Sequence, residues 1–199
     1  MKCAQAYPQR AAFCILLLSA INAVPALAAD AHVHGRAALQ VSVDGNRLLL
    51  EFSSPLDNLV GFEHAPRNDK QTAAVRGMAE RLHNPSALFM PTPQAACAPA
   101  SVELKSAVLE PALLAGKAAP RPTPERPLSQ SAKGKSTQEE HAALSAEVVF
   151  NCERPEKLSS LEVRIFDAFP HVRRLDVQVA GARKQAAASL TPRNRRLSW

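Results

Sequence analysis

The chain has 199 residues, of which 46% are hydrophobic and 5% aromatic, and its formal net charge is +6 at pH 7. The basic excess does not indicate nucleic-acid binding, because its clusters lack the interleaved aromatic residues that stack on bases. These clusters are Lys117, Arg121, Arg126, Lys133 and Lys135 in a Pro-rich stretch, and Arg193, Arg195 and Arg196 near the end.

The first 28 residues are predicted to be a secretory signal peptide. Lys2 and Arg10 supply positive charge, residues 11–24 are mostly apolar, and Ala26-Leu27-Ala28 has the small-residue pattern at which such peptides are cleaved. The apolar run is shorter than the roughly 20 residues that span a membrane, so we expect no span in the mature form. Residues 29–199 are expected to form a single domain.

Two histidines stand two residues apart at the start of the expected mature chain. In an extended segment His32 and His34 leave the same face, which places two imidazoles side by side. Neighbouring ligands of one transition-metal ion need this arrangement. The alternative is that both are polar residues of a frayed terminus.

A β-hairpin follows. Residues 37–43 and 48–53 alternate between apolar and other residues, and Asp44-Gly45-Asn46 separates them. Alternation on both sides of Asp-Gly is a strong hairpin signal. Residues 56–64 are then expected to be a loop or a short turn of helix.

Residues 66–84 are predicted to be a helix. Asn68 can cap it, with Gln71 three residues later as in a capping box. An apolar stripe at helical spacing would pack on the sheet, and Pro85 closes the segment. The stripe consists of Val75, Met78, Ala79 and Leu82.

Further strands are predicted around residues 102–108, 146–150, 161–165, 175–179 and 190. Residues 111–141 are rich in Pro, Ala, Lys and Ser and are expected to form a mobile, disordered insertion. The fold class is therefore α+β: a mainly antiparallel sheet, one clear helix packed on it, and the central insertion.

Cys97 and Cys152 are the cysteines that remain after the expected cleavage. An even pair in an oxidising compartment indicates a disulfide, which would stabilise the chain by roughly 4 kcal/mol in the chain-entropy model. The alternative is thiolate ligation of a metal, although no C-x-x-C pair is present.

Glu63 and His64 follow the second hairpin strand. If their loop folds back along the first strand, both side chains reach the edge that carries His32 and His34. Alternatively, His64 is a hydrogen-bonded structural histidine and Glu63 pairs with Arg67. Further candidate ligands are Asp167, His171 and, beside the insertion, His141.

An enzyme is not expected. The sequence contains no G-x-S-x-G elbow, no H-E-x-x-H helix and no Gly-rich phosphate loop. Ser53, Ser54 and Asp57 lie between the histidines, but a Ser-His-Asp set is recognised by geometry and such an assortment arises by chance.

Several strings together resemble the ZrgA family of periplasmic zinc-uptake proteins. The resemblance runs from about residue 31 to the end of the chain, and Gly-Phe-Glu-His-x-Pro is its most particular string. The strings are His32-Val33-His34-Gly35, Asp44-Gly45, Ser54-Pro55-Leu56-Asp57-Asn58-Leu59, Gly61-Phe62-Glu63-His64-Ala65-Pro66, Phe150-x-Cys152 and Phe166-x-x-Phe169-Pro170.

The resemblance implies that the protein binds zinc in the periplasm and supports a zinc ABC transporter or its binding protein. It singles out His32, His34, Glu63 and His64 as metal-site residues, with Cys97 and Cys152 as paired cysteines. Family members often carry a His/Asp/Glu-rich stretch in the central insertion. Here residues 111–141 are Pro-, Ala- and Lys-rich, which favours one core zinc site over storage of several ions.

The leading hypothesis is thus a non-catalytic periplasmic protein that captures zinc and passes it to an import system. Two alternatives stay open. One is an envelope interaction module in which the histidines are incidental. The other is a copper protein, because imidazole sites bind copper more tightly than zinc under equal supply.

Overall fold

The computed structural model describes residues 34–116, 142–181 and 185–199. The expected signal peptide, His32, His141 and most of the expected insertion therefore lie outside the described residues. Within the described part of the chain, no helix has the length and apolar character needed to cross a membrane.

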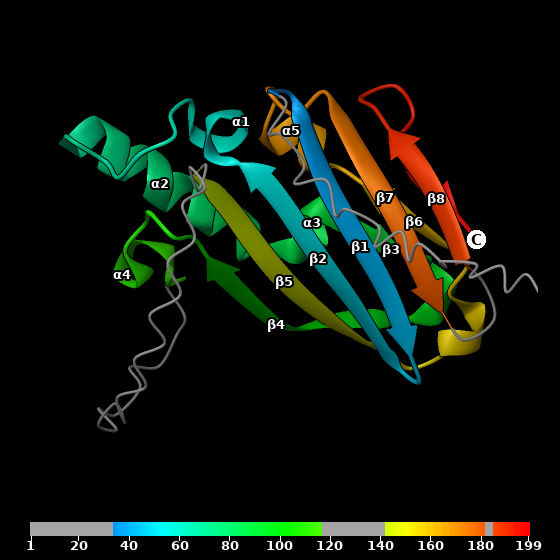
Figure 1. Cartoon of the computed structure of the whole chain (residues 1–199). Coiled ribbons are helices and arrows are strands. Elements are labelled where there is room, and N and C mark those ends of the chain that lie inside the picture. Colours follow the sequence, from blue (N-terminus) through cyan, green and yellow to red (C-terminus); the bar gives the residue numbers. More distant parts are fainter. Residues whose placement is uncertain (1–33, 117–141, 182–184) are drawn as a thin grey trace, which may run out of the picture. The chain divides into compact units, whose positions relative to one another are not determined.

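The largest element is a six-stranded sheet in the order β4-β5-β2-β1-β7-β8 (Figure 1). Neighbours pair antiparallel except β1 and β7, which run parallel. The mainly antiparallel α+β architecture predicted from the sequence is confirmed. The strands are β1 (Arg36–Asp44), β2 (Arg47–Pro55), β4 (Cys97–Lys105), β5 (Ala143–Cys152), β7 (Arg174–Gly181) and β8 (Gln185–Leu190).

The predicted hairpin is β1 and β2. Asp44 pairs with Arg47, so Gly45 and Asn46 form a two-residue turn. Alternate residues face the core: Leu39, Val41, Leu48 and Leu50 are all 0% exposed. The period-2 pattern thus selects which face of the sheet is buried.

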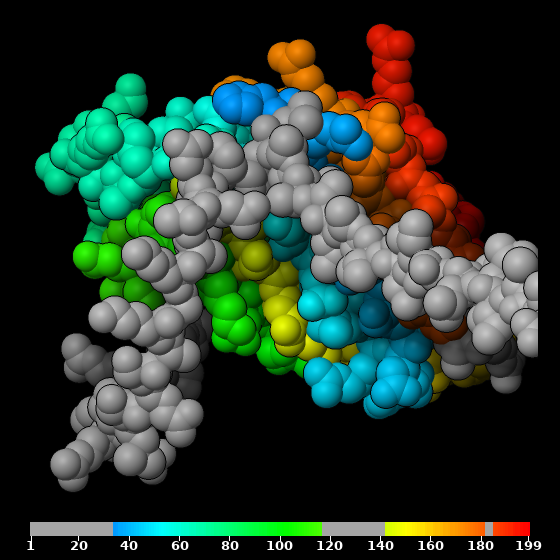
Figure 2. Space-filling view, viewed as in Figure 1, coloured from blue at the N-terminus to red at the C-terminus, as the bar shows by residue number. Residues whose placement is uncertain are grey.

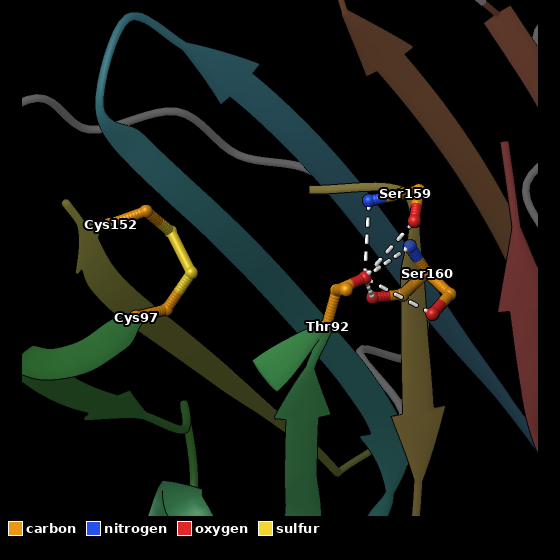
Figure 3. Close-up of a disulfide and its surroundings, with 5 residues drawn as sticks. All are labelled: Thr92, Cys97, Cys152, Ser159 and Ser160. Carbon is orange, nitrogen blue, oxygen red and sulfur yellow. Dashed lines mark hydrogen bonds between the residues drawn. A yellow bond between two sulfur atoms is a disulfide. The ribbon is translucent and has the colours of Figure 1, made fainter. Parts of the chain in front are cut away.

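A second sheet of three short strands, in the order β3-β6-β9, lies behind the large sheet in Figure 1. Its inward residues, among them Phe89 and Leu161, join the same apolar core. Thr92 links the first two strands, since its Oγ1 accepts backbone hydrogen bonds from Ser159 (3.1 Å) and Ser160 (2.8 Å), as Figure 3 shows. These strands are β3 (Phe89–Pro91), β6 (Ser160–Val163) and β9 (Arg196–Ser198).

The predicted long helix is α2 (Asp69–Leu82). The Asn68 side chain accepts a hydrogen bond from the Gln71 backbone N–H, which confirms the cap. The Gln71 side chain in turn accepts from the backbone N–H of Arg67, one residue before the cap. All four residues of the predicted apolar stripe are buried, and Pro85 opens the next helix, so α2 ends where the sequence indicates.

Short helical segments connect the strands. Residues 111–114, within the range expected to be an insertion, form α4, and Leu114 is buried in the core. The remainder of that range, 117–141, lies outside the described residues. The short segments are α1 (Leu56–Val60), α3 (Pro85–Leu88), η1 (Pro93–Ala95), α4 (Pro111–Leu114), η2 (Pro155–Lys157) and α5 (Ile165–Ala168).

Cys97 and Cys152 form a disulfide with an S–S distance of 2.04 Å (Figure 3). They are directly opposite each other where β4 pairs with β5, so the bond closes the end of an edge strand onto its neighbour. Both sulfurs are therefore held in the disulfide, so neither of these two cysteines is a thiolate that could ligate a metal. A disulfide fits an oxidising compartment.

Candidate metal site

The candidate site lies at the end of the large sheet where β1 begins. Here α1 follows β2 directly, and its residues Leu56 and Leu59 are 0% and 8% exposed. Burial of these two side chains fixes the helix to the core and leaves Asp57 at the surface. Gly61, in the left-handed conformation with φ +83°, ends α1 and leads into the Phe62-Glu63-His64 loop.

Asn58 joins α1 to the start of β1. Its side chain is almost fully buried, with 2% of the residue exposed. Its Oδ1 accepts from the Gly35 N–H (2.7 Å), and its Nδ2 donates to the Arg36 carbonyl (2.8 Å) and to Ser54 Oγ (3.2 Å). One buried amide thus satisfies backbone groups on both sides of Gly35.

Gly35 is held from the opposite side by the chain that enters β7. Its carbonyl accepts hydrogen bonds from the N–H groups of Arg173 (2.8 Å) and Arg174 (3.0 Å). Its φ is +83°, a conformation that glycine adopts without the steric penalty of a side chain. The residue immediately before it, His34, therefore starts from a fixed backbone.

His34 is directed toward α1. Its Nδ1 lies 3.3 Å from Asp57 Oδ2, and the two side chains are 71% and 32% exposed. Figure 2 shows the blue first residues of the described chain at the surface, next to the cyan segment that contains α1. An imidazole nitrogen and a carboxylate oxygen, both groups that ligate zinc, thus lie side by side at an open position.

Glu63 and His64 lie in the loop after α1. Glu63 Oε1 is buried and, among the described side chains, is the one buried oxygen or nitrogen without a hydrogen-bond partner. A buried carboxylate oxygen without a partner is costly, which fits a residue whose partner is a cation. The pairing of Glu63 with Arg67 considered above is not present in the described structure.

His64 is held in a defined orientation. Its ring stacks on Phe62 with centroids 5.1 Å apart, and its Nδ1 lies 2.8 Å from the Ala65 carbonyl oxygen. A carbonyl oxygen only accepts hydrogen bonds, so Nδ1 carries the proton and Nε2 of the neutral ring carries the lone pair. Metal-binding histidines are commonly oriented in this way, by donating from one nitrogen to a carbonyl.

The described residues contain no group of three or more His, Cys, Asp or Glu side chains arranged to hold one metal ion. They bring together His34 and Asp57, but they do not bring Glu63 or His64 into one three-residue cluster with that pair. His32, the neighbour expected to complete the edge, lies outside the described residues.

The other candidates have different surroundings. Asp167 pairs with Arg195 at 2.5 Å, so its carboxylate is already matched by a cation. His171 is exposed. Its backbone carbonyl oxygen lies near Gly35 and would be 3.6 Å from a Cβ placed on that glycine. His83, at the end of α2, lies with its Nε2 2.8 Å from the Leu114 carbonyl oxygen.

A charged network borders this end of the sheet. The Asp176 carboxylate binds Ser189, Arg36 and Arg174 across three neighbouring strands. These contacts hold the pKa of Asp176 well below its usual range, chiefly through the hydrogen bond from the Ser189 hydroxyl and then through the two guanidinium groups. The network stabilises the β1, β7 and β8 surface next to the site.

Asp57 is the site residue that the sequence did not reveal. It belongs to the string of residues 54–59 in the family resemblance and to a chance Ser-His-Asp set, but neither pattern marks it as a ligand, because a lone aspartate before an asparagine has no metal-ligand spacing. The residues that bring Asp57 to His34 are Gly35, next to the histidine, and Asn58, next to the aspartate. Their proximity depends on the Asn58 hydrogen bonds, which the sequence does not show.

Comparison with known proteins gives one family. The model of a family described as "ZrgA family zinc uptake protein" matches residues 31–199. No curated protein sequence matches the chain.

Proposed function

Since the chain belongs to the ZrgA family of zinc uptake proteins, we propose that it is a periplasmic zinc-binding protein that captures zinc and supports a zinc ABC transporter. The family match over residues 31–199 is the observation that carries this proposal. The protein acts by reversible coordination rather than by catalysis. The disulfide between Cys97 and Cys152 supports an oxidising location, and the expected signal peptide would direct the chain there.

The proposed ligands are His32, His34, His64 and Glu63. Three observations support this set. The His34 imidazole lies at the surface beside a carboxylate, the lone pair of neutral His64 is on Nε2, and Glu63 has a buried oxygen without a partner. Imidazole and carboxylate ligands suit zinc, whose sites usually take four ligands.

The open position of His34 suits a carrier. Its side chain is 71% exposed, so water or a ligand from another protein can reach the metal there. Catalytic zinc sites leave a position open to an exchanging group, whereas structural sites are closed by four protein ligands. A protein that must pass its ion to an importer needs this kind of access.

Zinc titration of the metal-stripped mature protein tests the proposal. The double variant His32→Ala/His34→Ala should lose more affinity than the roughly 10–100-fold that removal of a supporting residue costs. His83→Gln is the matched control, because His83 already donates to the Leu114 carbonyl and glutamine keeps a donor. Binding should weaken in acid, since imidazole ligands must be neutral. An unchanged affinity in the double variant would show that the site is wrong.

Two measurements separate the alternatives. Metal analysis of protein purified from its own periplasm should find zinc, whereas copper would support the alternative of a copper-binding protein. Growth of a deletion strain under zinc chelation should be restored by the parent chain but not by the double variant. Equal restoration by both would favour an interaction module that does not use metal.

A further inference from the structure

We propose that Asp57 is itself a zinc ligand, bound next to Nδ1 of His34. This inference rests on the proposed function and adds to it a residue from outside the four named ligands. It also assigns which nitrogen of His34 meets the metal.

The distance between the two side chains carries the inference. Zinc bonds of 2.0–2.1 Å to imidazole and 2.0–2.2 Å to carboxylate, at a tetrahedral angle, place two ligand atoms about 3.3–3.5 Å apart. His34 Nδ1 and Asp57 Oδ2 are 3.3 Å apart. The separation of the pair is thus that of two adjacent zinc ligands.

Both members of the pair are placed by the fold. Asp57 is on α1, between Leu56, which is 0% exposed, and Asn58, which is 2% exposed. Asn58 in turn binds the backbone of Gly35 and Arg36 directly after His34. The two ligand-bearing segments are thus joined through one buried side chain, and little reorganisation is needed when the ion binds.

Asp57 also differs from the other aspartates near the site. Asp167 pairs with Arg195, and Asp176 binds Arg36 and Arg174, so each of these carboxylates is neutralised by arginine. The ion-pair partner of Asp57 in the described structure is His34, which is a cation only when protonated. A divalent metal ion bound beside Asp57 would supply the positive charge that arginine supplies to Asp167 and Asp176.

Zinc titration of Asp57→Asn tests the inference, with Asp44→Asn as the control. Asp44 is an exposed aspartate at the end of β1 opposite to the site, so the control removes the same charge away from His34. We expect Asp57→Asn to lose about 100-fold or more in zinc affinity and Asp44→Asn to match the parent. Asp57→Glu should recover part of the loss. Urea unfolding of each variant establishes that the domain is folded in the titration.

NMR of histidine labelled with ¹⁵N distinguishes a ligand from an orienting residue. The His34 signals are assigned by their loss in His34→Gln. We expect zinc to shift His34 Nδ1, with the proton on Nε2. Zinc on Nε2 with the proton retained on Nδ1 would overturn the inference, as would equal affinities in Asp57→Asn and Asp44→Asn. Absence of zinc binding in the parent chain is a separate result, which would refute the proposed function itself.

Discussion

Replacement of Asn58 by Ala should destabilise the domain by about 2–3 kcal/mol. The change removes three hydrogen bonds, of 2.7, 2.8 and 3.2 Å, from a residue that is 2% exposed. Loss of a hydrogen bond that leaves a buried donor or acceptor without a partner costs about 1–3 kcal/mol. The Gly35 N–H and the Arg36 carbonyl are partly buried, so the loss of each hydrogen bond should cost about 1 kcal/mol. The Ser54 hydroxyl adds little to this sum, because it keeps its contact with the Pro55 carbonyl at 3.1 Å.

Urea unfolding of the mature protein measures this loss. For a domain of this size, about 2–3 kcal/mol corresponds to a fall in Tm of roughly 4–12 °C. Ser54→Ala, which keeps the two shorter Asn58 bonds and removes the longest one together with the Ser54 contact to the Pro55 carbonyl, should cost less than Asn58→Ala. Zinc affinity should also fall in Asn58→Ala at a temperature where the variant is folded, because His34 loses its fixed backbone. A loss of stability below about 0.5 kcal/mol would refute the assignment of Asn58 as the link between α1 and β1.

Three further predictions follow from named contacts. Replacement of Cys97 and Cys152 together by Ala should lower the free energy of unfolding by about 4 kcal/mol, measured in urea, and a reductant should lower the parent to the same value. Gly35→Ala should cost about 1–2 kcal/mol because of its φ of +83°, and zinc titration should show weaker binding as well. Asp176→Asn should cost less than about 1 kcal/mol of unfolding free energy at pH 7. Because the pKa of Asp176 is lower in the folded than in the unfolded protein, this difference should shrink as the pH falls below about 4, the pKa of an unfolded aspartate. A pH series of unfolding curves measures it.

The elements predicted well are those whose signals are local. The hairpin is determined by alternation on both sides of Asp44-Gly45, and α2 by Asn68, the stripe to Leu82, and Pro85. Each signal lies within about 15 residues of sequence, so neighbouring side chains decide the structure. Strand pairing does not share this property.

The parallel contact between β1 and β7 illustrates what alternation leaves open. Arg36 pairs with Arg174, far along the chain, and the period-2 pattern of each strand is the same whichever neighbour it has. The segment predicted as a strand to Ile165 ends instead at Val163, where α5 begins two residues later. The three residues of β9 are too few for a periodic signal, so the second sheet was not predicted.

The candidate site also has one part that the sequence could predict and one part that it could not. The residue types that bind zinc could be read from His32, His34 and Glu63-His64, and these assignments stay predictions. The Asp57 contact could not be read, because it depends on Asn58 bonding to Gly35 across 23 positions of sequence. Distance in the fold, rather than spacing in the chain, brings that carboxylate to His34.

The buried core argues that zinc is cargo and does not hold the domain together. The described core is apolar from Leu39 on β1 to Leu197 on β9, and the disulfide closes its edge. His34 and Asp57 lie at the surface outside it. We therefore expect the metal-stripped protein to keep its far-UV circular dichroism, with zinc adding about 2.7 kcal/mol at 100 times the Kd. That increment should raise Tm by roughly 5–11 °C in a thermal scan. Unfolding on chelation, as in zinc fingers, would instead show that the ion is structural.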